Sequence, residues 1–290
     1  MRGSTISRRV LLLFGVVACF GHLVFAGTLY TIGPDSTMSW PTGFYSVSTG
    51  GTATWKFDLG DGSLGFNGGL AFNPFNNLFY AIANDSGGNS SLVSFSPWGG
   101  GAFTPIGGLG QGFVSGLAYS TSDGYLYGIS TDWLGNSSLS RISLGGAVTP
   151  LGSLGSGFIG GRGLTFRPAD GLLYGVSAGA LGTPCLFQSI DPVALPPTQL
   201  FDFCSGSAWF DGGVAWSWAD GLFYVISNDW SGSTLQTLTP AGTLTPVGVI
   251  GGGFWNVGLV DATPIPEPSL WLPLAAALMA GVWVRFRRRA

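Results

Sequence analysis

Three loops of the sequence each place an Asp among small polar residues, and these residues are the best suited to binding chemistry. The acids are Asp85, Asp132 and Asp229, and each directly follows an Asn or a Thr. Asp, Asn and backbone carbonyl oxygens are the ligands that Ca²⁺ prefers. The same residue types also accept hydrogen bonds from the backbone of their own loop. The loops therefore predict either a calcium site or a purely conformational role, and no other cofactor is expected.

Two of these loops carry a tryptophan directly after the Asp. The residues are Trp133 and Trp230. An indole beside Asp and Asn can stack on a sugar ring while the polar groups bind its hydroxyls, so both residues are predicted glycan contacts. The alternative is that each indole packs on a neighbouring part of the fold, as large aromatic side chains usually do.

Hydrolytic catalysis has little support in the composition. The only His is His22, the only Glu is Glu267, and a Ser nucleophile would therefore lack its usual base over most of the chain. Asp123, Asp170 and Asp220 lie in Asp-Gly turns, where Asp is expected for conformational reasons. A non-enzymatic protein is predicted, and an Asp-dependent hydrolase acting on glycans is the alternative.

The charge distribution argues against nucleic acid as a partner. Between residues 27 and 262 the chain holds 4 Lys and Arg residues against 13 Asp residues, a net charge of about −9. Phosphate binding requires clustered Lys and Arg. The remaining basic residues lie at the two ends of the chain.

An internal repeat organises the sequence from residue 69 onward. Five equivalent glycines open the copies, and the intervals between them are 47, 47, 50 and 45 residues: Gly69, Gly116, Gly163, Gly213 and Gly258. In the first four copies a Tyr follows 11 residues later, after a turn with the Asp-Gly or Asn-Asn signature of a β-hairpin. Each copy reads as four short strands, the fourth ending at a Thr-Pro pair such as Thr104 and Pro105. This period is typical of a β-propeller blade.

The two ends of the repeat series predict how the ring closes. Tyr30 lies in a second-strand sequence that no first strand precedes, and Gly258 opens a first-strand sequence that no second strand follows. Pairing of the two would complete one blade. We therefore predict an all-β propeller of five four-stranded blades over residues 27–262, closed by its termini. A β-sandwich or an open stack of hairpins is the alternative.

Two cysteines lie within the predicted propeller. Cys185 and Cys204 are 19 residues apart, and an even pair in an exported chain predicts a disulfide. Closing a loop of that size would add about 3 kcal/mol of stability. The third cysteine, Cys19, lies in the N-terminal segment, where lipidation is an alternative to simple cleavage.

Residues 1–26 have the pattern of a secretory signal peptide. Arg2, Arg8 and Arg9 precede an apolar run over residues 10–20, and a small-residue cleavage motif ends at Ala26. The chain is therefore predicted to be exported.

Residues 263–290 have three parts in a fixed order. A Pro-rich linker contains Pro266, Glu267 and Pro268, and an apolar run over residues 270–284 follows it. As a helix this run would measure about 22 Å, against a hydrocarbon core of about 30 Å, so it is a short transmembrane helix. The chain then ends in a basic cluster of Arg285, Arg287, Arg288 and Arg289, which is expected to stay cytoplasmic.

This tripartite tail resembles the PEP-CTERM sorting signal of Gram-negative bacteria. The resemblance covers only about the last 27 residues. It implies recognition by an exosortase, processing near the Pro-Glu-Pro motif, and a transient stay in the inner membrane before the protein reaches the cell surface or extracellular matrix. It also implies a setting of exopolysaccharide and biofilm production. An ordinary C-terminal anchor is the alternative.

Overall fold

The computed structural model describes most of the predicted propeller and neither end of the chain. The described residues are 28–34, 41–60, 62–67, 69–113, 116–156, 163–178, 184–203, 209–211, 213–254 and 258–262. The predicted signal peptide, the Pro-Glu-Pro motif, the apolar run 270–284 and the Arg cluster lie outside them and stay predictions. Within the described ranges, no helix has the length and apolarity that a membrane span requires.

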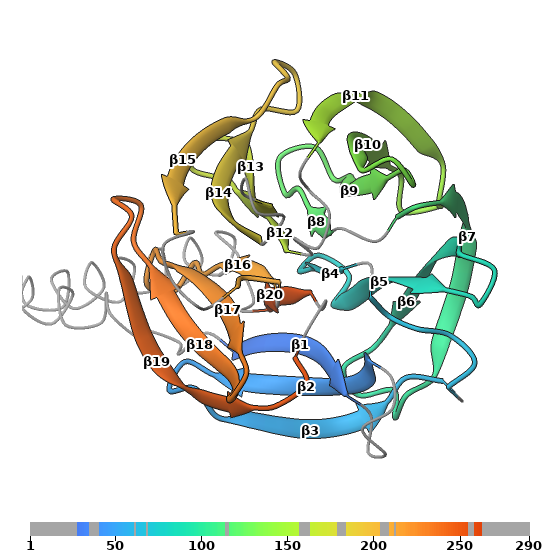
Figure 1. The fold of residues 1–290 in the computed structure, drawn as a ribbon. Coiled ribbons are helices and arrows are strands. Elements are labelled where there is room, and N and C mark those ends of the chain that lie inside the picture. The colour runs from blue at the N-terminus through green and yellow to red at the C-terminus, as the bar shows by residue number, and fades with distance from the viewer. Residues whose placement is uncertain are drawn as a thin grey trace, which may run out of the picture.

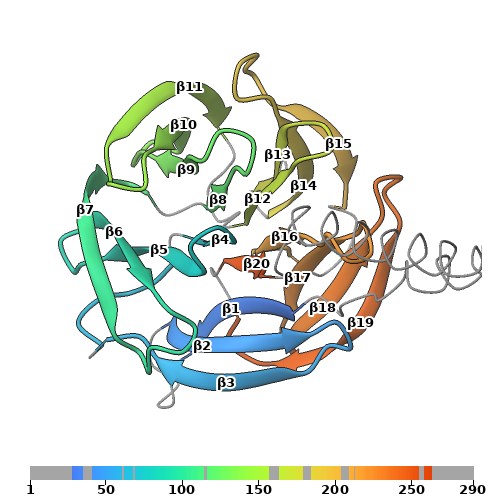
Figure 2. The ribbon, with the colours of Figure 1, turned by 180° about the vertical axis from the view of Figure 1, so that it is seen from behind.

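Five four-stranded antiparallel sheets surround a common axis as the blades of a propeller (Figures 1 and 2). The innermost strands are β4 (Leu70–Asn73), β8 (Leu117–Tyr119), β12 (Leu164–Arg167), β16 (Val214–Trp216) and β20 (Leu259–Asp261). The second strands are β1 (Thr28–Pro34), β5 (Leu78–Asn84), β9 (Leu126–Thr131), β13 (Leu172–Ala178) and β17 (Phe223–Asp229). The third strands are β2 (Pro41–Ser48), β6 (Asn89–Phe95), β10 (Asn136–Ile142), β14 (Pro184–Ile190) and β18 (Gly232–Leu238). The outermost strands are β3 (Ala53–Asp58), β7 (Phe103–Gln111), β11 (Val148–Ser156), β15 (Thr198–Asp202) and β19 (Leu244–Gly251).

The blade built from both ends of the repeat region closes the ring. In this blade, here called blade 1, the strand order is β20-β1-β2-β3, and blades 2 to 5 follow along the chain. Strand β20 pairs antiparallel with β1 from Leu29 opposite Asp261 to Thr31 opposite Leu259. The buried Thr31 hydroxyl also donates a 2.8 Å hydrogen bond to the Gly258 carbonyl. The predicted five blades and their closure by the termini are confirmed.

The five opening glycines form a ring at the start of the inner strands, here called the glycine ring. A Cβ added to Gly69 would lie 2.4 Å from the Leu117 nitrogen of the next blade, and one on Gly163 would lie 2.2 Å from the Val214 nitrogen. Gly258 closes the series, since its Cβ would lie 2.3 Å from the Leu70 nitrogen. The inner strands can approach this closely only without side chains, which explains why the repeat opens on Gly.

Each Asp-Gly turn is held by a clamp between its Asp and the Tyr four residues later. In blade 5 one Asp220 carboxylate oxygen accepts the Leu222 backbone N–H at 3.1 Å, and the other accepts the Tyr224 hydroxyl at 2.6 Å. The pairs Asp123–Tyr127 and Asp170–Tyr174 repeat this hydroxyl bond at 2.7 and 2.6 Å. The turn carboxylates therefore have the conformational role that the sequence predicted.

These clamps predict a loss of stability in alkali. Burial, and then the bond to Asp220, raise the pKa of the Tyr224 hydroxyl above its usual 10.0, and the pKa of Tyr127 is raised for the same reasons. A folded-state pKa above the unfolded value gives stability that is complete below pH 10 and lost as the pH rises further. Urea unfolding between about pH 8 and pH 11 should show this fall, and Tyr224→Phe should reduce it. An equal fall in stability for Tyr224→Phe and the wild type over this pH range would contradict the prediction.

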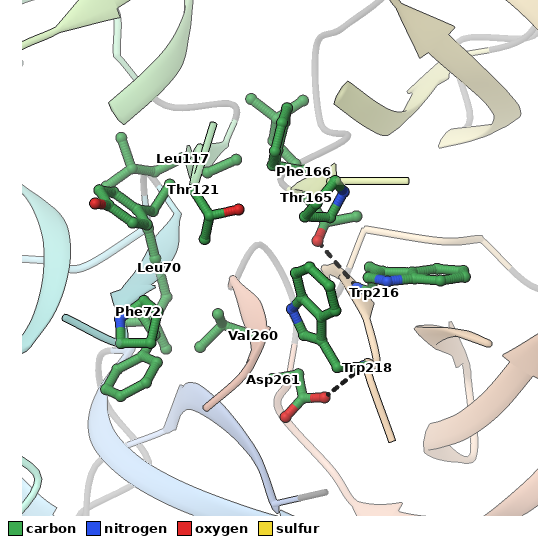
Figure 3. A pocket seen from close by; sticks show the side chains of 16 residues that line it. Leu70, Phe72, Leu117, Thr121, Thr165, Phe166, Trp216, Trp218, Val260 and Asp261 are labelled. Atoms are coloured by element: carbon green, nitrogen blue, oxygen red, sulfur yellow. Dashed lines mark hydrogen bonds between the residues drawn. The ribbon is translucent and has the colours of Figure 1, made fainter. Parts of the chain in front are cut away.

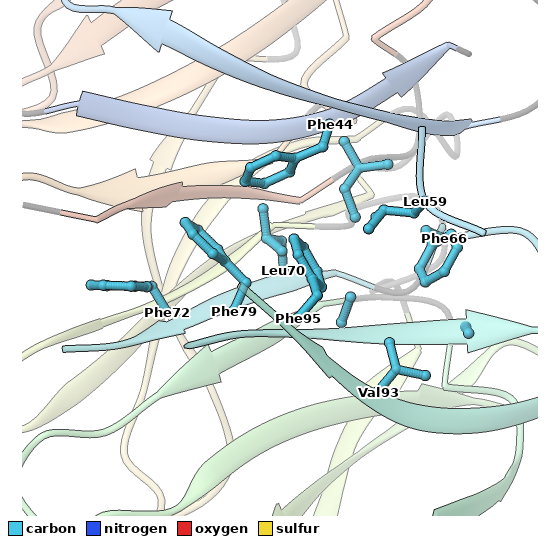
Figure 4. Close-up of a cluster of buried hydrophobic side chains, with 11 residues drawn as sticks. Phe44, Leu59, Phe66, Leu70, Phe72, Phe79, Val93 and Phe95 are labelled. Atoms are coloured by element: carbon cyan, nitrogen blue, oxygen red, sulfur yellow. The ribbon is translucent and has the colours of Figure 1, made fainter. Parts of the chain in front are cut away.

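The hydrophobic core consists of five clusters, one at each junction between neighbouring blades. Figure 4 shows the cluster between blades 1 and 2, where aromatic rings pack around the fully buried Phe44. The rings of Phe79 and Phe95 lie 5.0 and 5.1 Å from that of Phe44, both edge to face. The apolar residues of the strands therefore serve to join the blades.

The Thr-Pro pairs begin the outermost strands, so the prediction that they end these strands was wrong. Strand β7 continues past Pro105 to Gln111, and the equivalent strands β11 and β19 behave alike. A register shift between Leu92 and Val93 places Pro105 opposite Val93 beside a bulge. An outermost strand tolerates Pro there because only one of its sides pairs with a neighbour.

Candidate functional site

The propeller has two structurally distinct ends. The strand directions place the glycine ring and the loops between second and third strands at one end, here called the loop face. The turns between first and second strands lie at the other end, here called the turn face. Trp133 lies in the loop after strand β9, and Trp230 directly follows the last residue of strand β17, so both are on the loop face.

Both predicted glycan contacts are fully presented to solvent. Trp133 is 91% exposed and Trp230 is 93% exposed, so the alternative of packing on a neighbouring blade is wrong for both. Trp133 belongs to blade 3 and Trp230 to blade 5, in equivalent loops. The Trp209 ring, from the segment before β16, lies 5.4 Å from that of Trp230 at 82°, so a second indole lies beside the blade 5 loop.

The loop Asp residues hold these loops in shape. One Asp132 carboxylate oxygen accepts the backbone N–H groups of Leu134 and Asn136, at 2.9 and 2.8 Å. The other accepts the Asn136 side-chain amide at 2.9 Å. Asp229 likewise accepts the backbone N–H and the hydroxyl of Ser231. The tryptophans therefore stand on hairpins whose conformation is fixed from within.

These hydrogen bonds also hold the loop carboxylates in their charged form. The side-chain amide and then the backbone N–H of Asn136 lower the pKa of Asp132 below 3.8. The pKa of Asp85 is lowered through the same contacts with Asn89. Hydrogen bonds from Ser231 lower the pKa of Asp229.

The three loop carboxylates do not share one site. Asp85, Asp132 and Asp229 lie in blades 2, 3 and 5, and each is engaged within its own hairpin. Across the described part of the chain, no three His, Cys, Asp or Glu side chains are gathered as a metal site would need. The geometry thus favours the conformational role over the calcium hypothesis.

A pocket opens on the propeller axis at the turn face (Figure 3). Its volume is about 50 Å³, and its walls are the ends of all five inner strands. Five of the lining residues are aromatic, namely Phe72, Tyr119, Phe166, Trp216 and Trp218. Asp261 is the one acidic residue among those that line it. A glycosidase needs two carboxylates, one on each side of the scissile bond. The residues that line this pocket include one carboxylate, so the pocket does not support the alternative of an Asp-dependent hydrolase.

The sequence analysis did not find this pocket, because its walls come from five strands far apart in the chain. The available signal was the alignment of the inner strands. Their third residue is aromatic in four blades and is Asp261 in blade 1.

The structure leaves the proposed disulfide untested. Cys185 is buried in strand β14, and its carbonyl accepts the Phe203 backbone N–H at 3.0 Å. Residue 204 itself lies outside the described ranges. The Cys185–Cys204 bond therefore remains a prediction.

Comparison with known families assigns the repeat. The family model DUF6923, described as a repeat of unknown function, matches residues 92–258. The chain belongs to the DUF6923 family. The matched part of this DUF6923 protein runs from blade 2 to the start of β20, and it contains Trp133, Trp230 and four of the five ring glycines. No curated protein matches the sequence.

Solved structures resemble this DUF6923 protein in fold alone. TolB from Acinetobacter baumannii is 13% identical with a TM-score of 0.52, over 89% of this chain and 74% of TolB. A protein from Lactobacillus plantarum is 16% identical with a TM-score of 0.43, over 78% of this chain and 82% of its own. The GH43_1 enzyme from Xanthomonas citri, complexed with xylose, is 12% identical with a TM-score of 0.43, over 62% and 72%.

Proposed function

We propose that this protein is an exported, non-enzymatic component of the cell surface or extracellular matrix, and that its loop face binds exopolysaccharide. The observation that carries the proposal is the near-complete exposure of Trp133 and Trp230 in equivalent loops of one face. Large indoles exposed to this degree have an unfavourable contact with water, and a binding partner would remove it.

The construction of the loops supports a binding role. Each indole stands next to an Asp whose carboxylate is locked by backbone N–H groups, so the loop needs little ordering on binding. Trp133 and Trp230 lie in blades 3 and 5, with blade 4 between them. Two separated stacking platforms on a rigid ring suit a long repetitive polymer, because the second contact gains from the first.

The sequence patterns at the two ends of the chain support the proposed location at the cell surface or in the extracellular matrix. The N-terminal segment has the pattern of a signal peptide, and the tail resembles a PEP-CTERM signal with its Pro266, Glu267 and Pro268 motif and Arg cluster. On this proposal an exosortase recognises the tail while the protein is held at the inner membrane. The protein then meets exopolysaccharide outside the cell.

Replacing both exposed indoles should weaken polysaccharide binding at least about tenfold without changing stability. The Trp133→Ala, Trp230→Ala double variant of the purified protein should retain less than about a tenth of the wild-type affinity for the producing bacterium's exopolysaccharide. A loss of about 1.4 kcal/mol in binding free energy corresponds to that factor. Because both side chains are over 90% exposed, the melting temperature should stay unchanged.

The matched control is Trp98→Ala, which removes an indole that is 87% exposed in the turn-face loop between β6 and β7. This variant should bind as the wild type does. Equal polysaccharide retention by the double variant and the wild type in pull-down and glycan-array assays would overturn the glycan-binding proposal.

A further inference from the structure

We propose that the turn-face pocket binds a small organic cation, an alkylammonium group, between the indole of Trp218 and the carboxylate of Asp261. This site lies at the opposite end of the axis from the loop-face tryptophans and is independent of the polysaccharide proposal. Figure 3 shows Trp218 and Asp261 side by side among the lining residues.

Trp218 and Asp261 differ in type from the residues at the equivalent positions of the other blades. The third position of the inner strands is aromatic in blades 2 to 5, as Phe72, Tyr119, Phe166 and Trp216, whereas blade 1 has Asp261. A second position lies two residues further along, at the rim of the pocket. Blades 2 to 4 have Pro74, Thr121 and Pro168 there, whereas blade 5 has Trp218.

The two exceptions touch each other. The Trp218 backbone N–H donates to an Asp261 carboxylate oxygen at 3.2 Å, although the two residues are 43 positions apart. Blades 2 to 4 show that the fold itself is built with an aromatic residue and a smaller rim residue at these places. Because this bond uses a backbone N–H, it positions the Asp261 carboxylate beside Trp218 at the mouth of the pocket without using the indole.

The chemistry of the pair selects a cation. A carboxylate attracts positive charge, and the face of an indole is the aromatic surface that attracts cations most strongly. The lining residues include no Lys or Arg, and residues 27–262 carry a net charge of about −9, which disfavours anions. The pocket wall already makes one contact of this kind, since the Arg167 guanidinium lies 4.6 Å from the Trp216 ring centroid. Trp218 is 44% exposed, so part of its side chain is open to a ligand.

The size of the pocket limits the ligand. A volume of about 50 Å³ holds roughly four water-sized groups at about 10–15 Å³ each. A methylated ammonium group has that size, whereas an intact sugar ring exceeds it. The glycine ring brings the inner strands together at the other end of the axis, so the ligand enters from the turn face.

The test is direct titration of the purified protein with tetramethylammonium and propylammonium, followed by calorimetry and tryptophan fluorescence. We expect saturable binding of at least one of them, and much weaker binding of the uncharged analogue tert-butanol. Asp261→Asn keeps the shape and an oxygen for the Trp218 N–H but removes the charge, so it should weaken binding at least tenfold. Trp218→Leu should also weaken binding at least tenfold.

The controls separate this site from the loop face and from misfolding. Trp98→Ala and the Trp133→Ala, Trp230→Ala double variant should bind the ammonium probes normally. Should Trp218→Leu fail to fold, Trp218→Phe keeps an aromatic ring and should bind several-fold more weakly. Equal affinity of Asp261→Asn and wild type, equal binding of tert-butanol, binding of simple sugars instead, or no saturable binding would each overturn the proposal.

Discussion

Replacing Gly213 by Ala is expected to lower the free energy of unfolding by about 3 kcal/mol. Gly213 has a φ of +100°, and an added Cβ would lie 2.5 Å from the Leu259 nitrogen of the closing strand β20. The left-handed conformation costs an L-residue about 1–2 kcal/mol, and forcing an extra carbon into a packed site costs about 1–3 kcal/mol. Backbone atoms cannot move aside as a flexible side chain does, so the clash is not relieved locally. Urea unfolding of the purified variant measures the change.

Variants at two other glycines distinguish the conformational cost of the Gly213→Ala substitution from its steric cost. Gly88 has a φ of +78° but no atom within 4 Å of an added Cβ, so Gly88→Ala should show the conformational cost alone. Gly108 has open space and no positive φ, so Gly108→Ala should leave the stability unchanged. If Gly213→Ala were no more destabilising than Gly88→Ala, contact between blades in the glycine ring would not contribute to stability.

Truncation of Phe44 to Ala is expected to cost about 4 kcal/mol, the usual range for a buried Phe being about 3–5 kcal/mol. Phe44 is fully buried, and its ring stacks on Tyr30 at 5.3 Å and on Phe57 at 5.2 Å within blade 1. It also contacts the rings of blade 2, so its removal opens a cavity at the junction of the blade that closes the ring (Figure 4).

Phe75→Ala is the matched control, because the Phe75 side chain is 70% exposed in the turn after β4. It should change the free energy of unfolding by less than about 0.5 kcal/mol. Both variants can be compared by urea unfolding under the same conditions. A loss below about 1 kcal/mol for Phe44→Ala would mean that the blade junction is not a packed core.

The fold was predictable because the same pattern of strands and turns recurs in every copy of the repeat. The glycines mark the start of the first strand and the tyrosines mark the second strand of each blade. The second strand at Tyr30 lacks a first strand and the first strand at Gly258 lacks a second, so the two complete one blade. The conformational role of Asp123 was predictable for the same reason. Local turn chemistry is sufficient to explain a residue that recurs at every turn.

The candidate sites were predictable only in part. The sequence identified Trp133 and Trp230, but whether an indole packs or projects depends on the space between blades, which a local pattern does not contain. The pocket around Asp261 was missed, because the sequence shows it only as a departure from a repeat. The Thr-Pro error arose because Pro ends a paired strand but is tolerated on an outermost strand beside a bulge.

The closing blade also places both ends of the described propeller at one face of the ring. The Ala262 backbone N–H donates to the Thr28 carbonyl at 3.2 Å, so the described chain enters and leaves the ring at neighbouring points. Strand β20 runs from the glycine ring toward the turn face, and Ala262 follows its end. On the proposed membrane attachment through the tail, the point of attachment to the propeller would be Ala262, at the pocket end of the axis. Trp133 and Trp230 lie at the opposite end of the axis, so on the proposed attachment the loop face would be the face farther from the membrane.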